Sequence, residues 1–314
     1  MDKGAKIWVA GRDTLLGRAL MELLFQQGYR NILGLEEPEL DFEDGKQVEE
    51  FFSAQMPEYV FMTAGKSGGI AANQKFPADL MRSNLLAACY IFDAARRHGV
   101  HKLLYVASSC IYPKFGRQPL APEFLLNGEL EPTSQSYALA KLSGLQLCQA
   151  YRRQYRMPFI CAIPGDVFGP FYEQDPEDLH VIPALIQKMH QARITGEGAV
   201  TLWGSGDPRR DFIFSSDVAD AAAFLMENYN GLEPVNIGSG EDYSVKEIAC
   251  LIQQVVGFKG RLEFDWNKPD GDPLKLLDTR CLNRMGWFPK IPIREGLRHT
   301  YDFFLKDVPS PIGI

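Results

Sequence analysis

The sequence predicts an α/β fold with a doubly wound parallel sheet, followed by a smaller α/β domain that binds substrate. Short apolar runs alternate with amphipathic, helix-like segments through the first half of the chain, and such alternation implies parallel strands joined by helical crossovers. The apolar runs are nearly continuous, as in strands that are buried on both faces. A chain of 314 residues is long enough for a principal domain with a smaller companion.

The first half supplies the large sheet. We expect five strands, at 6–11, 31–35, 59–65, 102–109 and 159–165, and four helices, at 14–28, 44–55, 79–99 and 137–155. In open sheets of this class, ligands bind where the carboxyl ends of the strands meet. The side chains and turns that follow the strands are therefore the first candidates for a site, namely Gly11, Glu36, Gly65, Ser108 and Asp166.

The texture of the sequence changes after about residue 170. Segments rich in glycine, proline and charge, such as 204–212 and 266–273, indicate turns. Further helices are expected at 181–193, 216–229, 244–256 and 294–306. We predict a dinucleotide-binding domain over 1–165 and a mainly substrate-binding domain over 166–314, with some elements of the second part returning to the first.

Composition excludes several classes of protein. The net charge of −7 and pI of about 5.4 argue against a surface for nucleic acid. The six cysteines are widely spaced, with no C-x-x-C pair, so neither a zinc site nor a disulfide framework is expected. No apolar run approaches the roughly 20 residues that span a bilayer, and the start lacks the apolar region of a signal peptide. We expect a cytoplasmic protein with no bound metal and no membrane contact.

The turn after the first strand predicts a dinucleotide-binding loop. In the sequence VAGRDTLLGRAL, Gly11 and Gly17 have the spacing of the outer glycines of a G-x-x-G-x-x-G fingerprint. The first glycine permits a tight turn and the last permits close helix–strand packing, so that the helix amino terminus faces a pyrophosphate. Thr14 replaces the middle glycine, which in this motif lets the backbone approach the phosphates.

The choice of cofactor stays open at this point. Glu36 and Glu37 follow the second expected strand, where acidic side chains accept hydrogen bonds from the ribose hydroxyls of NAD(H) and repel the extra phosphate of NADP(H). Arg12, in the first loop, instead favours NADP(H), because a guanidinium can pair with the extra phosphate of that cofactor.

Tyr137 and Lys141 form a candidate proton-transfer pair. They are four residues apart on an expected helix, which stacks them on one face. An ammonium beside a phenol favours the phenolate, so we expect a lowered pKa for Tyr137. Such a phenol can exchange a proton with a sugar oxygen while hydride moves at carbon. Ser108, after the fourth strand, can hydrogen-bond the same oxygen.

These motifs carry a resemblance to a known family. The glycine loop, SSCIYPK (108–114) and EPTSQSYALAK (131–141) resemble the extended short-chain dehydrogenase/reductases, and the likeness is greatest to the GDP-L-fucose synthase family, which are GDP-4-keto-6-deoxymannose 3,5-epimerase/4-reductases. The segments at 66–84, 180–188, 203–212 and 268–278 extend the resemblance over essentially the whole chain. It implies a Rossmann-type domain, use of NADP(H), a GDP-sugar substrate and a homodimer.

The resemblance also implies roles for residues. Ser108, Tyr137 and Lys141 would form the reductase triad, and Cys110 with His180 would be the acid/base pair for epimerisation. A C4 ketone acidifies the C–H bonds at C3 and C5, and a thiol and an imidazole can both move protons near neutral pH. Contacts with the substrate are expected from Lys188, Trp203, Arg210, Lys275 and Asp166. The expected cofactor contacts are Gly11, Arg12, Asp13, Thr14, Leu15, Leu16, Gly17, Glu36, Glu37, Ala64, Gly65, Lys66, Asn84, Tyr137, Lys141, Pro164, Val167 and His180.

Several positions depart from the family pattern. Besides Thr14, Glu36 and Glu37, Asp166 stands where the family has an asparagine, and a carboxylate near a diphosphate is unfavourable unless it is paired or protonated. Leu274 replaces a basic residue of some members. The departures favour a relative with a different nucleotide, sugar or cofactor. The leading hypothesis is an epimerase/reductase for a GDP-linked 4-keto sugar. The alternatives are a redox-neutral, NAD-dependent nucleotide-sugar epimerase and a non-catalytic nucleotide-sensing or scaffold protein, and the intact triad argues against the last of these.

Overall fold

A parallel five-stranded sheet forms the centre of the protein, as the sequence predicts. The computed structural model describes residues 1–35, 40–171 and 179–307. The strands follow one another in the order β1-β2-β3-β4-β9, and every neighbouring pair is parallel. Their bounds are β1 Ile7–Ala10, β2 Tyr59–Met62, β3 Lys102–Val106, β4 Phe159–Pro164 and β9 Val235–Ile237.

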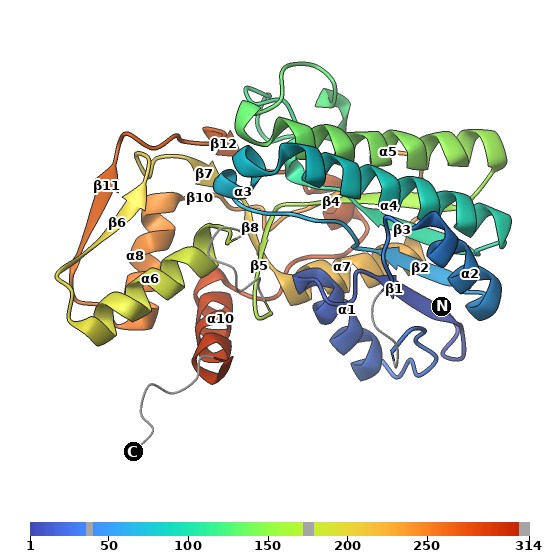
Figure 1. Ribbon diagram of the computed structural model, residues 1–314, viewed down its shortest axis with the longest axis horizontal. Coiled ribbons are helices and arrows are strands. Elements are labelled where there is room, and N and C mark those ends of the chain that lie inside the picture. Colours follow the sequence, from blue (N-terminus) through green and yellow to red (C-terminus); the bar gives the residue numbers. More distant parts are fainter. Residues whose placement is uncertain (36–39, 172–178, 308–314) are drawn as a thin grey trace.

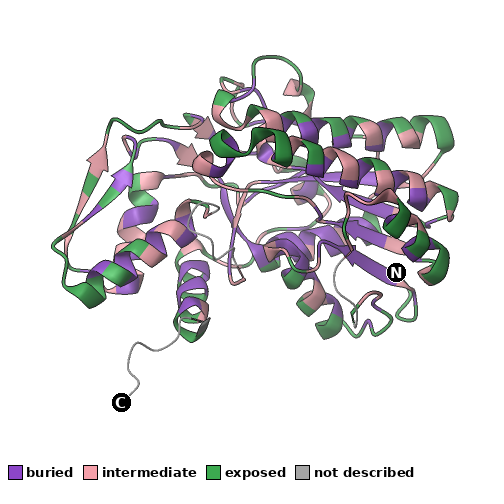
Figure 2. Cartoon of the chain, in the orientation of Figure 1, coloured by how far each residue is buried: buried purple, intermediate pink, exposed green. Residues whose placement is uncertain are grey.

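Helices cover both faces of this sheet (Figure 1). The apolar cluster on one face takes in α1 and α7, and the cluster on the other face takes in α2, α4 and α5. The bounds are α1 Leu15–Gln26, α2 Gly45–Gln55, α4 Pro77–Arg97, α5 Gln135–Tyr155 and α7 Ser215–Asn228, with the short α3 Ile70–Lys75 leading into α4. The strands are buried between these layers (Figure 2), which explains their nearly continuous apolar character.

The strand expected at 31–35 is reduced to a single bridge, so that prediction is wrong in extent. Ile32 pairs with Ile7 in parallel, and backbone bonds join Ile7 to Asn31 and Leu33. The chain then turns at Gly34, whose φ is +76°, and Leu35 is exposed. A glycine in the left-handed region ends extended pairing, so the pairing with β1 ends at Leu33.

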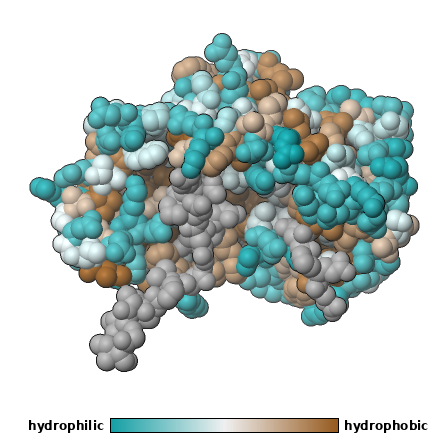
Figure 3. All heavy atoms as spheres, in the orientation of Figure 1, coloured by the Kyte–Doolittle hydropathy of each residue, from teal (hydrophilic) through white to brown (hydrophobic). Residues whose placement is uncertain are grey.

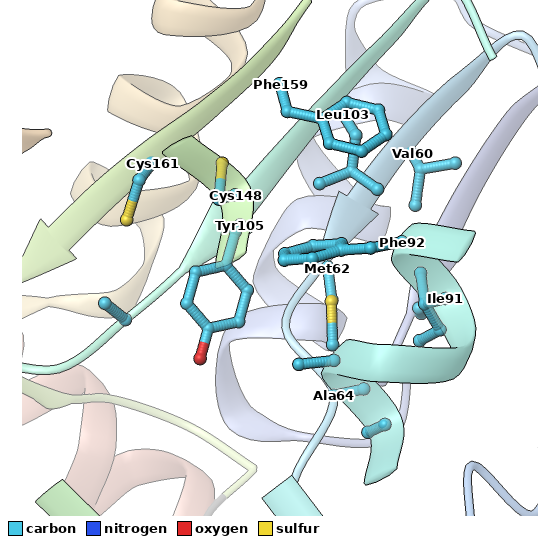
Figure 4. Packing of buried hydrophobic residues seen from close by; sticks show 14 of the residues in the cluster. Val60, Met62, Ala64, Ile91, Phe92, Leu103, Tyr105, Cys148, Phe159 and Cys161 are labelled. Carbon is cyan, nitrogen blue, oxygen red and sulfur yellow. The ribbon is translucent and has the colours of Figure 1, made fainter. Parts of the chain in front are cut away.

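Aromatic packing fixes α4 and α5 on the sheet. Phe92 of α4 is fully buried, and its ring centroid lies 5.5 Å from that of Tyr105 and 5.6 Å from that of Phe159. Figure 4 shows this ring between Met62 on one side and Leu103 with Phe159 on the other. Offset and edge-to-face aromatic contacts of this kind add to the free energy of burial. Tyr151 of α5 joins the same group, with its ring centroid 6.1 Å from that of Phe92 and 5.9 Å from that of Phe159, so these contacts also hold the helix that carries Tyr137 and Lys141.

A third apolar cluster lies in the second half of the chain. It is formed mainly by α6, α8 and α10 with the strands beside them. The bounds are α6 Val181–Thr195, α8 Val245–Val256 and α10 Ile293–Asp307. Three small sheets complete this part, namely β5 Asp166–Phe168 with β8 Phe212–Phe214, β6 Ala199–Trp203 with β11 Arg261–Asp265, and β7 Arg209–Arg210 between β10 Tyr243–Ser244 and β12 Leu274–Lys275.

Some elements of the second half join the first. Strand β9 pairs with β4, α7 packs against α1, and α9 (Arg280–Arg284) contacts β9. The boundary at residue 165 stays a prediction. Hydrophilic side chains cover much of the face shown in Figure 3, with smaller groups of apolar residues between them. Among the described helices, none is both long and apolar enough to cross a membrane.

Candidate active site

The carboxyl ends of β1, β2, β3 and β4 meet at one edge of the sheet, because all four strands run in the same direction. The loops that leave this edge carry several of the predicted site residues: Gly11 follows β1, Ala64 and Gly65 follow β2, and Ser108 follows β3. Pro164 is the last residue of β4, and Asp166 begins β5.

Close backbone approach explains both glycines of the dinucleotide loop. Gly11 has a φ of +89°, and a Cβ there would lie 2.6 Å from the amide nitrogen of Ala64. A Cβ on Gly17 would lie 1.9 Å from the carbonyl oxygen of Gly11. Any larger residue at either position would therefore push the loop away from the sheet or from the amino terminus of α1.

Thr14, the departure from the fingerprint, caps α1. Its Oγ1 accepts a hydrogen bond from the amide of Gly17 at 3.0 Å and donates to the carbonyl oxygen of Gly11 at 2.7 Å. Thr63, after β2, donates to that same carbonyl oxygen at 3.0 Å. The first-turn amides of Leu15 and Leu16 have no carbonyl partner within the helix. Together with the helix dipole they suit an anion such as a pyrophosphate.

The loop after β2 is closed against α4. Asn84 donates from Nδ2 to the carbonyl oxygens of Lys66 and Leu80, both at 2.8 Å. A Cβ on Gly65 would lie 2.1 Å from Asn84 Oδ1. That oxygen is buried and has no hydrogen-bond partner among the described residues. The Lys66 ammonium is paired with a carboxylate, 3.1 Å from Oε1 of Glu43. The groups of this loop that could contact a dinucleotide are therefore its backbone and the buried Oδ1 of Asn84 behind it.

The residues that bear on cofactor choice are only partly visible. Glu36 and Glu37 lie outside the described residues. Arg12 is half-buried in the loop after β1, with its Nε 3.8 Å from Oδ2 of the exposed Asp13. Val167, on β5, is half-buried. The two opposed expectations from the sequence therefore stay predictions at this level.

Helix α5 carries Tyr137 and Lys141 to the sheet edge. The approach is close because Gly144 has no side chain: a Cβ there would lie 2.3 Å from the hydroxyl of Tyr105 on β3. One turn earlier, the Lys141 ammonium is buried and donates to the carbonyl oxygen of Val106 at 3.3 Å. It lies 6.0 Å from the centroid of the Tyr137 ring, so the pair shares one face of α5 as predicted.

The expected lowering of the Tyr137 pKa is wrong for the protein's own groups. Burial raises the pKa of this phenol, and the nearby Cys110 adds to the effect, while a hydrogen bond with Ser108 opposes it. Burial also lowers the pKa of Lys141 to about 8. The physical reason is common to both groups: desolvation disfavours the charged form of each.

A compact group of charges lies next to this pair. Asp166 Oδ1 is 3.1 Å from the ammonium of Lys275, and Oδ2 is 3.5 Å from Nε of Arg210. The hydroxyl of Ser109 donates to Asp166 at 3.4 Å. Cys110 Sγ accepts from the Lys275 ammonium at 3.9 Å. The structure thus brings together Cys110 with three of the predicted substrate residues.

Asp166 is ionised despite its position. Burial works against its charge, but the ammonium of Lys275 and the guanidinium of Arg210 lower its pKa below the usual range, with a smaller contribution from His180. The condition set by the sequence, that a carboxylate here must be paired, is met. Sequence reasoning missed Asp272, a buried carboxylate with Oδ2 3.9 Å from the Lys275 ammonium. It sits in the glycine- and proline-rich segment 266–273, where nothing in the pattern distinguishes it from a turn former.

The other predicted residues lie on α6 and β6. His180 is the exposed N-cap residue of α6, and a Cβ on Gly69 would lie 2.6 Å from the carbonyl oxygen of the preceding Leu179, which places this segment against the loop before α3. Lys188 is exposed, 3.5 Å from the carbonyl oxygen of Thr201. Trp203, at the end of β6, is 46% exposed, with the ammonium of Lys268 4.9 Å from its ring centroid.

Comparison with known proteins relates nearly the whole chain to one family. The model of the NAD dependent epimerase/dehydratase family matches residues 7–238. The chain is 46% identical to "Probable GDP-L-fucose synthase 1" of Oryza sativa subsp. japonica, over 98% of this chain and 94% of the rice protein. It is 39% identical to GDP-L-fucose synthase of Escherichia coli, over 96% and 97%.

Solved structures show the same relationship. A GDP-6-OMe-4-keto-L-xylo-heptose reductase from C. jejuni superposes with a TM-score of 0.92 at 30% identity, over 98% of this chain and 99% of the other. A GDP-L-fucose synthetase from Naegleria fowleri bound to NADP superposes with a TM-score of 0.88 at 25% identity, over 98% and 96%.

The buried charge group leads to a prediction about stability. Asp166→Asn should lower the free energy of unfolding at pH 7 by about 1–3 kcal/mol, because an amide cannot match two cationic partners. A carboxyl with a depressed folded pKa stabilises the protein above its unfolded pKa of about 4, and that contribution is lost as the pH falls through the folded value. The difference from wild type, measured by urea unfolding, should therefore shrink below pH 4. The exposed Asp302→Asn serves as control, and an equal effect there would contradict the assignment.

Proposed function

The chain belongs to the NAD dependent epimerase/dehydratase family, and we propose that it is an epimerase/reductase that acts on a GDP-linked 4-keto sugar. The family and the relatives make it a nicotinamide-dependent oxidoreductase/epimerase. The observation that carries the proposal is that two groups able to transfer protons lie together at one sheet edge. They are the phenol of Tyr137, on the same helix face as Lys141, and the thiol of Cys110, in the loop after β3, which interacts with that phenol.

Tyr137 is proposed to supply the proton for reduction at C4. Because its pKa is raised by burial, the phenol keeps its proton at neutral pH and is ready to give it to the ketone oxygen. A nicotinamide held by the dinucleotide loop would supply the hydride. As the phenolate forms, the Lys141 ammonium on the same helix face stabilises it. Ser108, which hydrogen-bonds the phenol, is positioned to hold the same oxygen.

Cys110 and His180 are proposed to carry the epimerisation. A ketone at C4 acidifies the neighbouring C–H bonds, and inversion needs one group to remove the proton and another to return it to the opposite face. Support comes from their origins on different elements: Cys110 lies in the loop after β3, and His180 at the start of α6. A cleft between them would present two faces of the sugar ring to two different groups.

The nucleotide is proposed to bind across the second half of the chain. Lys188 and Trp203 offer an exposed ammonium and an exposed indole on neighbouring elements, which suit a phosphate and a purine base. Arg210 pairs with Asp166, which in turn contacts Lys275 beside Cys110. Its guanidinium therefore lies near the proposed site of the sugar and would meet the adjoining part of the diphosphate. The GDP moiety is supported by the names of the curated relatives and of the solved reductases.

The remaining expectations from the sequence are kept as proposals. A homodimer and a cytoplasmic location agree with the family resemblance described above. The alternative of a redox-neutral, NAD-dependent epimerase rested on Glu36 and Glu37, which lie outside the described residues. No described residue favours that alternative over reduction.

NADP(H) is the proposed cofactor, supported by the NADP-bound synthetase named above and by Arg12 in the loop after β1. Arg12→Ala should raise KM for NADPH about 10-fold, because a charge-assisted contact with the extra phosphate is lost, and should leave KM for NADH nearly unchanged. Steady-state kinetics with both cofactors measure this. Equal changes for the two cofactors would count against NADP(H).

Removal of the phenol should abolish reduction without unfolding the protein. Tyr137→Phe is expected to lower kcat for oxidation of NADPH by GDP-4-keto-6-deoxymannose by at least about 10²-fold, the usual contribution of a general acid. The melting temperature should stay close to that of wild type, since the ring and its packing remain. Leu139→Ala, at an exposed position on the same helix, is the control. Full turnover by Tyr137→Phe would refute the role of the phenol.

Epimerisation can be separated from reduction by isotope exchange. Incubation with GDP-4-keto-6-deoxymannose in deuterated water should place deuterium at C3 and C5, as followed by NMR, because each proton is removed and returned from a group that exchanges with solvent. Cys110→Ala and His180→Ala should each suppress incorporation by about 10²-fold or more. If wild-type protein reduces the sugar without deuterium at either carbon, the acid/base pair is wrong for this substrate.

A further inference from the structure

Lys275 carries a buried positive charge that no proposed step has yet used. Its side chain is only 9% exposed, and strand β12 holds it in parallel register with Arg210 of β7. The ammonium lies 3.1 Å from Oδ1 of Asp166 and 3.9 Å from Oδ2 of Asp272. A third contact, at 3.9 Å, is with Sγ of Cys110. An ammonium so enclosed is costly to bury unless each contact contributes to its charge balance.

We propose that Lys275 is a positioning residue for Cys110, and that its ammonium stabilises the thiolate through which Cys110 exchanges a proton with the sugar. The inference rests on the epimerisation proposed above. In that step the C–H bond next to the ketone breaks, the S–H bond forms, and the C–H electron pair enters the enolate of the C4 ketone. In the reverse transfer the thiol gives the proton back. The sulfur is a thiolate before it removes a proton and again after it returns one, and in that state it lies beside the Lys275 ammonium.

The charges around Lys275 keep it available for this role. Although burial alone would lower its pKa, Asp166 and then Cys110 raise it above the ordinary value, so the side chain is cationic throughout the neutral range. Burial raises the pKa of Asp272, and at 3.9 Å this carboxyl group lies farther from the ammonium than Asp166 does. Asp166 is shared with Arg210, which leaves part of the Lys275 charge directed at the sulfur.

The groups that face Cys110 come from several elements and differ in sign. The phenol of Tyr137 on α5 interacts with Cys110, and the carboxylate of Asp166 on β5 contacts the same Lys275 ammonium as the sulfur does. The positive groups are Lys275 itself and, behind Asp166, the guanidinium of Arg210 on β7, and the titratable imidazole of His180 before α6 also interacts with Asp166. Among the contacts described for the sulfur, Lys275 provides the cation within hydrogen-bonding range. Removing the Lys275 ammonium should therefore decrease the fraction of Cys110 present as thiolate, and removing the Asp166 carboxylate should increase it.

Alkylation of Cys110 tests this without sugar or nicotinamide. Only the thiolate reacts with iodoacetamide at an appreciable rate, so the rate of carbamidomethylation of Cys110, followed by peptide mass spectrometry from pH 5 to 10, reports the charge on sulfur. Lys275→Met should slow the reaction at pH 7 about 10-fold, equivalent to a displacement of the profile by about one pH unit. Lys275→Arg should retain most of the rate, and Asp166→Asn should displace the profile toward lower pH.

Matched controls make each result decisive. Cys281 on α9 is exposed and belongs to another part of the protein, so its alkylation profile should be the same in all variants. If Lys275→Met fails to fold, Lys275→Arg and the opposite shift in Asp166→Asn still test the proposal. Unchanged profiles of Cys110 in Lys275→Met and Asp166→Asn would overturn it. A missing deuterium signal with shifted alkylation profiles would instead refute the epimerisation and leave the contact between Lys275 and the thiol established.

Discussion

Parallel pairing of β1, β2, β3 and β4 is the constraint on which the site depends. It brings four strand ends to one edge of the sheet, so that the glycine turn after β1, the buried Asn84 acceptor and the proposed proton-transfer groups meet at that edge although they are scattered through the sequence. Glycines at places of close approach, such as Gly11 and Gly144, let the loop and α5 come near enough to the strands to use that edge. The second half of the chain then adds the charges that face it.

Desolvation shifts the protonation of Tyr137 and Lys141 in the proposed site. It raises the pKa of the Tyr137 phenol and lowers the pKa of Lys141 to about 8. The phenol that would donate the proton and the ammonium that would stabilise the resulting phenolate therefore lie on one face of α5. The arrangement suits reduction, in which the tyrosine begins as an acid, better than a mechanism that needs a phenolate from the start.

Charge compensation makes room for a carboxylate at the centre of the site. Asp166 stands where the family resemblance implies an asparagine, and it stays ionised because Lys275 and Arg210 face it. The carboxylate in turn keeps Lys275 charged beside Cys110. One departure from the family pattern is thus compensated by cations on β7 and β12.

The sequence alone determined the alternation of strands and helices, the glycine turn and the pairing of Tyr137 with Lys141, because these depend on local periodicity and spacing. The resemblance carried in its motifs identified Cys110, and that assignment remains to be tested. The early end of the strand at 31–35 and the direction of the Tyr137 pKa shift could not be predicted, since turn geometry and desolvation depend on what packs around a residue. Nor could the contact between Cys110 and Lys275, which are 165 positions apart. Only the tertiary structure decided that their side chains meet, because the parallel pairing of β12 with β7 joins segments far apart in the sequence, and no local pattern predicts it.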